Sequence, residues 1–225
     1  MNELIGRVFS FGKDVFHHQS ELYAKLSEGQ SPKALIISCA DSRVVPEHIV
    51  QAAPGDLFVC RNAGNIVPPY GNQNGGVTST VEYAVMVLGV TDIVVCGHSD
   101  CGAMKAFLHP EALEKMPNVA AWLRHSHAAH SVVCNAYPDL APDAYVRAMA
   151  LENVVVQINH LRTHPCVASA IAEGKLTLHG WLFDIETTSI LALDGATGRF
   201  AKPKGPVLPV AVAAGRRVAS EQAAE

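Results

Sequence analysis

The sequence A-L-I-I-S-C-A-D-S-R, at residues 34–43, joins an apolar run to a group of reactive side chains. Its first residues are apolar and rich in isoleucine, which is typical of a strand buried on both faces. Chemically reactive side chains follow this strand at once, namely Cys39, Asp41 and Arg43. Ligands of parallel sheets bind beyond the carboxyl ends of the strands, so the stretch predicts both a strand and one side of a site.

A second stretch, I-V-V-C-G-H-S-D-C-G at residues 93–102, has the same design. An apolar run leads directly into His98 and Cys101. Two strand ends would therefore present two thiols, an imidazole, a carboxylate and a guanidinium to the same edge of a sheet.

Further apolar runs of strand length lie at 57–60 and 176–185, and helical patterns lie between the runs. The helical patterns are at 77–88, 119–130, 145–161 and 167–173. This alternation predicts an α/β fold with a central, mainly parallel β-sheet flanked by helices. Segments 189–194 and 199–201 are expected to add an antiparallel hairpin at the edge of the sheet.

We expect one domain over residues 1–225, since no repeat or low-complexity linker divides the chain. Residues 4–26 carry apolar side chains near helical spacing, interrupted at Gly12, which predicts an N-terminal helical arm at 1–28 that is bent or made of two helices. The mixed composition of residues 203–225 predicts an extended or frayed tail.

The composition excludes several classes of protein. The 225 residues are 49% hydrophobic and 17% charged with a formal net charge of −4, which disfavours disorder and nucleic-acid binding. The sequence has no apolar run long enough to span a membrane, and its first residues do not resemble a secretory signal. Six cysteines in such a chain are not expected to form a disulfide framework, so we expect a cytoplasmic protein. The low charge also favours an oligomer.

Cys39, His98 and Cys101 are candidate ligands of a zinc ion, which proteins commonly bind through thiolates and imidazoles. Cys96 competes with Cys101 for this role, because residues i and i+2 of a strand share a face. The alternative is that these cysteines are core residues beside an ordinary histidine. The remaining cysteines, at 60, 134 and 166, are expected to be structural.

Together the motifs resemble those of the β-class carbonic anhydrases. The likeness depends on C-A-D-S-R at Cys39–Arg43, P-G-D-L-F-V-C-R-N at Pro54–Asn62 and G-H-S-D-C-G at Gly97–Gly102. Shorter matches are Q-S-P at 30–32, E-Y-A-V at 82–85 and H-G-W-L-F-D at 179–184. The Q-S-P stretch and the N-terminal arm resemble the plant-type and related bacterial branch of that family.

The resemblance implies one zinc ion per chain, held by Cys39, His98 and Cys101 with water or hydroxide in the fourth position. It implies that Asp41 and Arg43 form a catalytic dyad. The implied activity is that of a zinc-dependent lyase, the reversible hydration of carbon dioxide to bicarbonate and a proton. Zinc-hydroxide attack would be the chemical step, with the dyad orienting the nucleophile.

The resemblance also assigns substrate-binding roles to Gln30, Phe58, Tyr83 and Gly102. Tyr83 would reach the site from a partner subunit, and Gly102 would offer its backbone N–H to the substrate. The family fold is an obligate dimer, often assembled further into tetramers or octamers. The implied partners are therefore a second copy of the chain and the small molecules carbon dioxide and bicarbonate.

Two other functions share these residues. A hydrolase of carbon disulfide or carbonyl sulfide would use the same zinc ligands and dyad, whereas a structural zinc protein would close the site with a fourth ligand. Relatives regulated by bicarbonate carry Trp and Tyr where this chain has Ile36 and Phe183, although Arg61 matches their arginine. We therefore expect no regulatory anion site, and an Asp41 carboxylate paired with Arg43.

Overall fold

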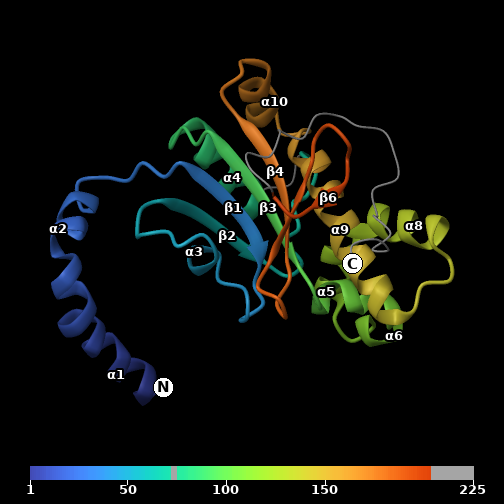
Figure 1. Cartoon of the computed structure of the whole chain (residues 1–225), viewed down its shortest axis with the longest axis horizontal. Helices are drawn as coiled ribbons and strands as arrows, with labels where there is room; N and C mark the ends of the chain where they lie inside the picture. Colours follow the sequence, from blue (N-terminus) through green and yellow to red (C-terminus); the bar gives the residue numbers. More distant parts are fainter. Residues whose placement is uncertain (72–74, 204–225) are drawn as a thin grey trace.

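The computed structural model describes residues 1–71 and 75–203, and one six-stranded sheet forms its centre (Figure 1). The strands are β1 Ala34–Cys39, β2 Leu57–Asn62, β3 Asp92–His98, β4 Thr177–Phe183, β5 Ile190–Leu193 and β6 Phe200–Ala201. Their spatial order is β2-β1-β3-β4-β5-β6, with the first four parallel and the last two antiparallel. The predicted parallel sheet and its edge hairpin are confirmed. The expected tail lies, apart from its first residue, outside the described residues.

The α-helices are α1 Asn2–Ser10, α2 Phe16–Leu26, α3 Pro46–Ile49, α4 Gly76–Met86, α5 Gly102–Lys105, α6 Pro110–Leu113, α7 Pro117–Leu123, α8 His127–Ala136, α9 Pro142–Leu161 and α10 Pro165–Ala172. Proline at the first position of α9 begins that helix three residues earlier than the periodicity predicted, because its fixed φ suits a first turn. The single helix expected at 119–130 is wrong. A 3-10 turn at Arg124–Ser126 separates α7 from α8, and there the buried Ser126 hydroxyl donates to Asn153 Oδ1 at 2.7 Å.

The larger core lies on the face of the sheet that α9 covers. This helix packs across β3 and β4 and is buried along most of its length. Close approach is possible because β3 has a glycine at the contact: a Cβ on Gly97 would lie 2.9 Å from Val154 Cγ2. A glycine just before His98 thus lets helix and strand meet beside the predicted site.

A smaller apolar cluster occupies the opposite face and includes Ile36, Val94, Cys96 and Phe183. Side chains alternate along a strand, so Cys96 lies on the opposite face from Ile93 and Val95 in the larger core. The second face carries the short α3, whose Ile49 packs against this cluster. The Cys96 thiol therefore serves as a core side chain.

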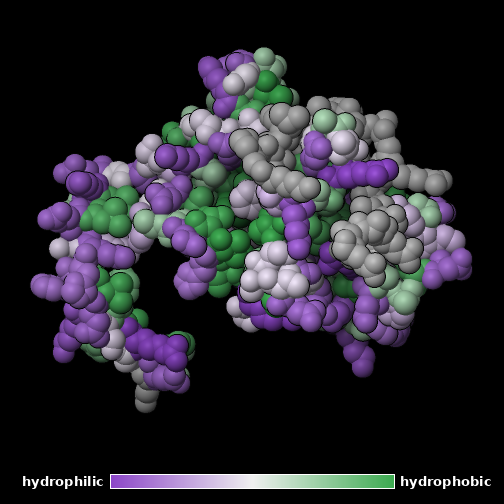
Figure 2. Space-filling view, in the orientation of Figure 1, coloured by the Kyte–Doolittle hydropathy of each residue, from purple (hydrophilic) through white to green (hydrophobic). Residues whose placement is uncertain are grey.

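The N-terminal arm extends away from the sheet (Figure 1). Its two helices are joined by a π-helical turn at Phe11–Val15, which contains Gly12, so the predicted interruption is confirmed. Large apolar side chains of the arm are exposed, with Val8 and Phe9 at 69% and 70%. Hydrophobic side chains gather on the side of the arm that faces the body across a gap (Figure 2). Among the described residues, no helix is long and apolar enough to cross a membrane.

Candidate metal centre

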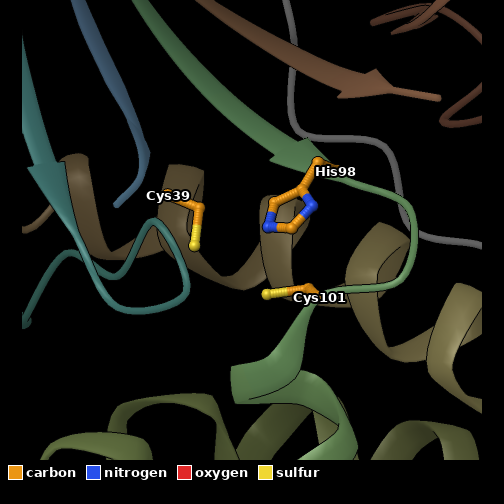
Figure 3. Close-up of side chains that lie close together, drawn as sticks. All are labelled: Cys39, His98 and Cys101. Carbon is orange, nitrogen blue, oxygen red and sulfur yellow. The ribbon is translucent and has the colours of Figure 1, made fainter. Parts of the chain in front are cut away.

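Three potential metal ligands meet where β1 and β3 end. The two strands are neighbours in parallel register, so Cys39 at the end of β1 lies beside the end of β3 that carries His98. The chain then turns back to Cys101, and the three side chains point toward one another (Figure 3). All three are buried, and their ligand atoms lie within 4.8 Å of one another. This spacing fits tetrahedral zinc, whose bonds to sulfur and nitrogen are about 2.0–2.3 Å long.

The hydrogen bond of the His98 imidazole leaves one of its ring nitrogens free to bind a metal ion. Its Nδ1 lies 2.8 Å from the carbonyl oxygen of Ser99, a contact in which Nδ1–H must be the donor. Nε2 then carries a lone pair, and this buried atom has no hydrogen-bond partner among the described residues. A buried polar atom without a partner costs free energy in a protein interior. A cation bound between His98 and the two sulfurs would satisfy the lone pair. The residues present therefore fit zinc.

The two thiols share one proton through a hydrogen bond between them. The hydrogen bond from Cys101, together with the backbone N–H of Gly64, holds the pKa of Cys39 well below its usual range. The hydrogen bond to Cys39, with burial, holds the pKa of Cys101 well above its usual range. The pair thus favours one thiolate and one thiol, and a divalent cation bound between the sulfurs would displace the remaining proton.

Helix α9 holds the loop that contacts Cys39. The N–H of Gly64 donates to Cys39 Sγ at 3.4 Å, and Gly64 adopts a left-handed φ of +82° that suits glycine. The buried Asn153 amide donates to the Gly64 carbonyl at 2.9 Å and accepts from Ser126 and Gln157. Gln157 in turn accepts the Val67 N–H at 2.9 Å. This buried network fixes a loop that has little regular structure of its own.

Asp41 and Arg43 form an ion pair beside the ligands. Arg43 donates from Nε and Nη2 to both carboxylate oxygens of Asp41, at 3.0 and 2.8 Å, and its backbone N–H donates at 3.0 Å. The Arg43 guanidinium holds the pKa of Asp41 well below its usual range. Asp41 Oδ2 lies 3.9 Å from His98 Nε2, so the carboxylate borders the ligand group. The expected pairing of the two side chains is present.

Arg61 and Asp100 also contact this turn, a role that was not predicted from the sequence for either residue. Arg61 donates to the backbone carbonyls of Cys39 and Asp41, at 3.1 and 2.7 Å, and so braces the turn after β1. Asp100 accepts from Arg43 Nη1 at 3.0 Å. An acidic residue between two predicted ligands was the signal that could have identified Asp100.

The predicted substrate-binding residues do not gather at one chain's ligands. Phe58 pairs with Leu35, four residues before Cys39, which places it about 13 Å along the strand from the ligand end. Its ring lies 6.0 Å from that of Tyr83, whose side chain is half exposed. Gln30 is exposed in the segment after α2, and Gly102 is the first residue of α5, next to Cys101.

Cys96 is outside the ligand group in the described part of the chain. Burial raises the pKa of its thiol to about 12, and the side chain packs in the smaller apolar cluster. Ile36 and Phe183, at which the sequence predicts no regulatory anion site, lie in that same cluster. The six cysteines are all free thiols.

Comparisons with known proteins identify relatives of this chain. Residues 34–190 match the sequence model of the family described as carbonic anhydrase. A carbonic anhydrase of Pseudomonas aeruginosa is 52% identical over 89% of this chain and 90% of its own length. Carbonic anhydrase 1 of Escherichia coli O157:H7 is 48% identical over 93% and 97%.

Solved structures show the same fold. The β-carbonic anhydrase CcaA matches with a TM-score of 0.90 and 42% identity, over 93% of this chain and 94% of that chain. A tetrameric β-carbonic anhydrase of the filamentous ascomycete Sordaria macrospora matches with a TM-score of 0.76 and 31% identity, over 85% and 95%. The matched sequence, fold and Cys-His-Cys group together establish that the chain belongs to the β-carbonic anhydrases, a family of zinc-dependent lyases.

Proposed function

We propose that this chain catalyses the reversible hydration of carbon dioxide to bicarbonate and a proton, with Asp41 and Arg43 orienting the nucleophile. The observation that carries the proposal is the unpartnered Nε2 of His98, which faces two thiols and lies 3.9 Å from a clamped carboxylate. Three ligands leave one position of a tetrahedral ion open, as in catalytic zinc sites, whereas structural sites close with four.

Cys39, His98 and Cys101 would hold the zinc ion. When bound, zinc supplies a Lewis acid that lowers the pKa of water and so makes a strong nucleophile near neutral pH. The protein's own contribution is a buried, fixed set of donors. The Gly64 N–H and the Ser99 carbonyl hold Cys39 and His98 in position from behind.

Asp41 is suited to orient a nucleophile. An ionised carboxylate only accepts hydrogen bonds, so it would accept the hydrogen of the attacking oxygen and leave a lone pair directed at the carbon of carbon dioxide. Arg43 keeps Asp41 ionised and holds both carboxylate oxygens in a two-pronged clamp. The clamp also prevents the carboxylate from moving into the ligand group.

The substrate pocket would be completed by a second copy of the chain. Phe58 and Tyr83 form one aromatic surface remote from the ligands of their own chain, which supports a pocket formed across a subunit interface with Gln30. Phe58 would provide an apolar wall for carbon dioxide. The first N–H groups of a helix lack partners within it, so the Gly102 N–H could donate to bicarbonate.

The arm supports self-association as a homodimer, with a tetramer as the larger assembly. Its exposed Val8 and Phe9 need an apolar partner surface, and the Sordaria macrospora relative is tetrameric. We expect no nucleic-acid or membrane partner. A reducing cytoplasm would suit six free thiols.

The test is stopped-flow carbon dioxide hydration at alkaline pH, with protein of measured zinc content. We expect one zinc per chain, rapid hydration, and a loss of about a hundredfold or more in Asp41→Asn at unchanged zinc content. Asp139→Asn, a change in the exposed turn between α8 and α9, is the matched control and should retain the wild-type rate.

Zinc-loaded protein that does not hydrate carbon dioxide would overturn the proposal, and turnover of carbonyl sulfide or carbon disulfide would then identify the other enzyme. Wild-type hydration by Asp41→Asn would overturn the role of the dyad alone.

A further inference from the structure

Asp100 occupies an unusual place in the backbone. It lies between the ligands His98 and Cys101 and has a left-handed φ of +59°, which is uncommon for a residue other than glycine. Aspartate and asparagine tolerate this conformation better than most residues. The turn that brings Cys101 back toward His98 thus also projects a carboxylate at the rim of the site.

The Asp100 carboxylate joins two cations. Its Oδ2 accepts from Arg43 Nη1 at 3.0 Å, and its Oδ1 is paired with the ammonium of Lys105 on α5. The Asp100 carbonyl oxygen lies 3.4 Å from Arg43 Nη2. Because Arg43 uses Nε and Nη2 for Asp41, its guanidinium is held from one side by Asp41 and from the other by Asp100.

Arg43 needs this second contact. Its side chain is 45% exposed, and an exposed ion pair between residues two apart is weak by itself. Asp41 is already 3.9 Å from His98 Nε2, so a small movement of an unclamped carboxylate would bring it among the ligands. Asp100 lies after a different strand, β3, so its contact with Arg43 fixes the guanidinium independently of Asp41.

We propose that Asp100, held by Lys105, is a positioning residue that locks Arg43 onto Asp41 and so keeps the Asp41 carboxylate out of the metal-ligand group. The inference rests on the proposed function, since it concerns the residue that orients the nucleophile. Asp100 and Lys105 act through Arg43 and are not required to touch the substrate.

The variants distinguish the effect of the Asp100 charge from the effect of the turn between His98 and Cys101. Asp100→Asn retains the size of the side chain and the preference for a left-handed turn but removes the charge that binds Arg43. Lys105→Gln removes the outer contact without a change in the turn. Glu186→Gln is the matched control, because Glu186 is an exposed carboxylate that lines the same cavity of about 450 Å³ as Arg43, Asp100 and Lys105.

The main readout is the visible absorption spectrum of the cobalt-substituted protein, which reports the ligands of the metal directly. We expect Asp100→Asn to change this spectrum and to lower kcat/KM about tenfold at unchanged metal content, with a smaller change of the same kind in Lys105→Gln. Glu186→Gln should match the wild type. In an Asp41→Asn background, Asp100→Asn should leave the spectrum unchanged, because the carboxylate that would move is absent.

Two results would overturn the inference. One is a wild-type spectrum and rate in Asp100→Asn. The other is a spectral change that persists in the Asp41→Asn background, which would show a distorted turn instead of a released carboxylate. If Asp100→Asn does not fold, a wild-type spectrum in Lys105→Gln decides against the inference. Failure of the proposed function is distinct, because the zinc-loaded wild-type protein would then not hydrate carbon dioxide, whatever the spectrum of Asp100→Asn.

Discussion

The two sides of the metal-ligand group are built in opposite ways. On the α9 side, buried and uncharged groups hold the loop behind Cys39 through Asn153 and Gln157. On the other side, exposed charged groups hold Asp41 through Arg43, which is braced by Asp100. One side is a neutral network in the core, and the other is a series of ion pairs at the surface.

Because of this difference, we expect the α9 side to contribute mainly to the stability of the protein and the charged side mainly to the catalytic rate. Breaking a buried hydrogen-bond network leaves unpaired polar groups in the interior, at a cost of about 1–3 kcal/mol for each. Exposed ion pairs contribute about 0–1 kcal/mol to stability, yet they can determine where a carboxylate points. Changes on the α9 side should therefore lower the free energy of unfolding, whereas changes on the charged side should lower the rate at nearly unchanged stability.

The largest effect is expected from the loss of a metal ligand, which lies between the two sides. Cys101→Ala removes one of three ligands, so zinc content should fall close to zero and hydration should be lost. The fold should persist, because Cys101 is one small side chain of a large apolar core. Metal analysis and circular dichroism measure the two properties, and full zinc occupancy in this variant would contradict the ligand assignment.

The next effect tests the neutral side. Asn153→Ala leaves the Gly64 carbonyl and the Ser126 hydroxyl without their partner, so the free energy of unfolding should fall by about 3 kcal/mol. Chemical denaturation of the metal-free protein measures it. Asn135→Ala is the matched control: its exposed amide donates to Ser131 on α8, and its substitution should change stability by less than about 0.5 kcal/mol. Equal losses in both variants would refute the contrast.

A smaller effect tests the charged side. Arg43→Lys retains the charge but loses the planar fork that binds both oxygens of Asp41, so kcat/KM should fall about tenfold to a hundredfold. The free energy of unfolding should stay close to that of the wild type, because an exposed ion pair contributes little to stability. Arg7→Lys, in the exposed Arg7–Glu3 pair of the arm, should change neither quantity. A loss of stability equal to the loss of rate would show that Arg43 is structural.

The smallest effect concerns Asp184, which lines the same cavity as Arg43. The Thr187 backbone N–H, with help from the Thr187 hydroxyl and Arg147, lowers the pKa of Asp184. The ionised form is thus favoured in the folded state, so this stabilisation is present above the usual pKa of about 4 and is lost as the pH falls below it.

Asp184→Asn should therefore lower the free energy of unfolding by about 1 kcal/mol at neutral pH, and the difference from the wild type should shrink in acid. Denaturation at a series of pH values measures it. A difference that grows as the pH falls would have the wrong sign.

The strands and the ligands could be located from the sequence because both have local signals. Apolar runs of β-branched residues ended at the chemistry-bearing residues, so β1 and β3 could be placed together with Cys39 and His98. The break between α7 and α8 had no such signal. It follows from a contact between Ser126 and Asn153, residues that are far apart in the sequence.

Side-chain direction was the other property that the pattern left open. Period-two alternation put Cys96 and His98 on one face, and only the packing of the chain shows Cys96 in the smaller apolar cluster and His98 directed at the sulfurs. The polar residues of α9 were visible in the sequence, but their partners lie about 90 residues away in the chain.

The α/β fold, the three ligands and the neighbouring Asp41 and Arg43 could all be predicted from the sequence, because each depends on residue type and on spacing along one strand and the turn after it. Three features required the folded chain to be seen: the exclusion of the Cys96 thiol from the ligand group, the helix that fixes the Gly64 loop, and the second carboxylate that contacts Arg43. Those features depend on distances between segments remote in the sequence, and such distances are set by packing of the whole chain rather than by any local pattern.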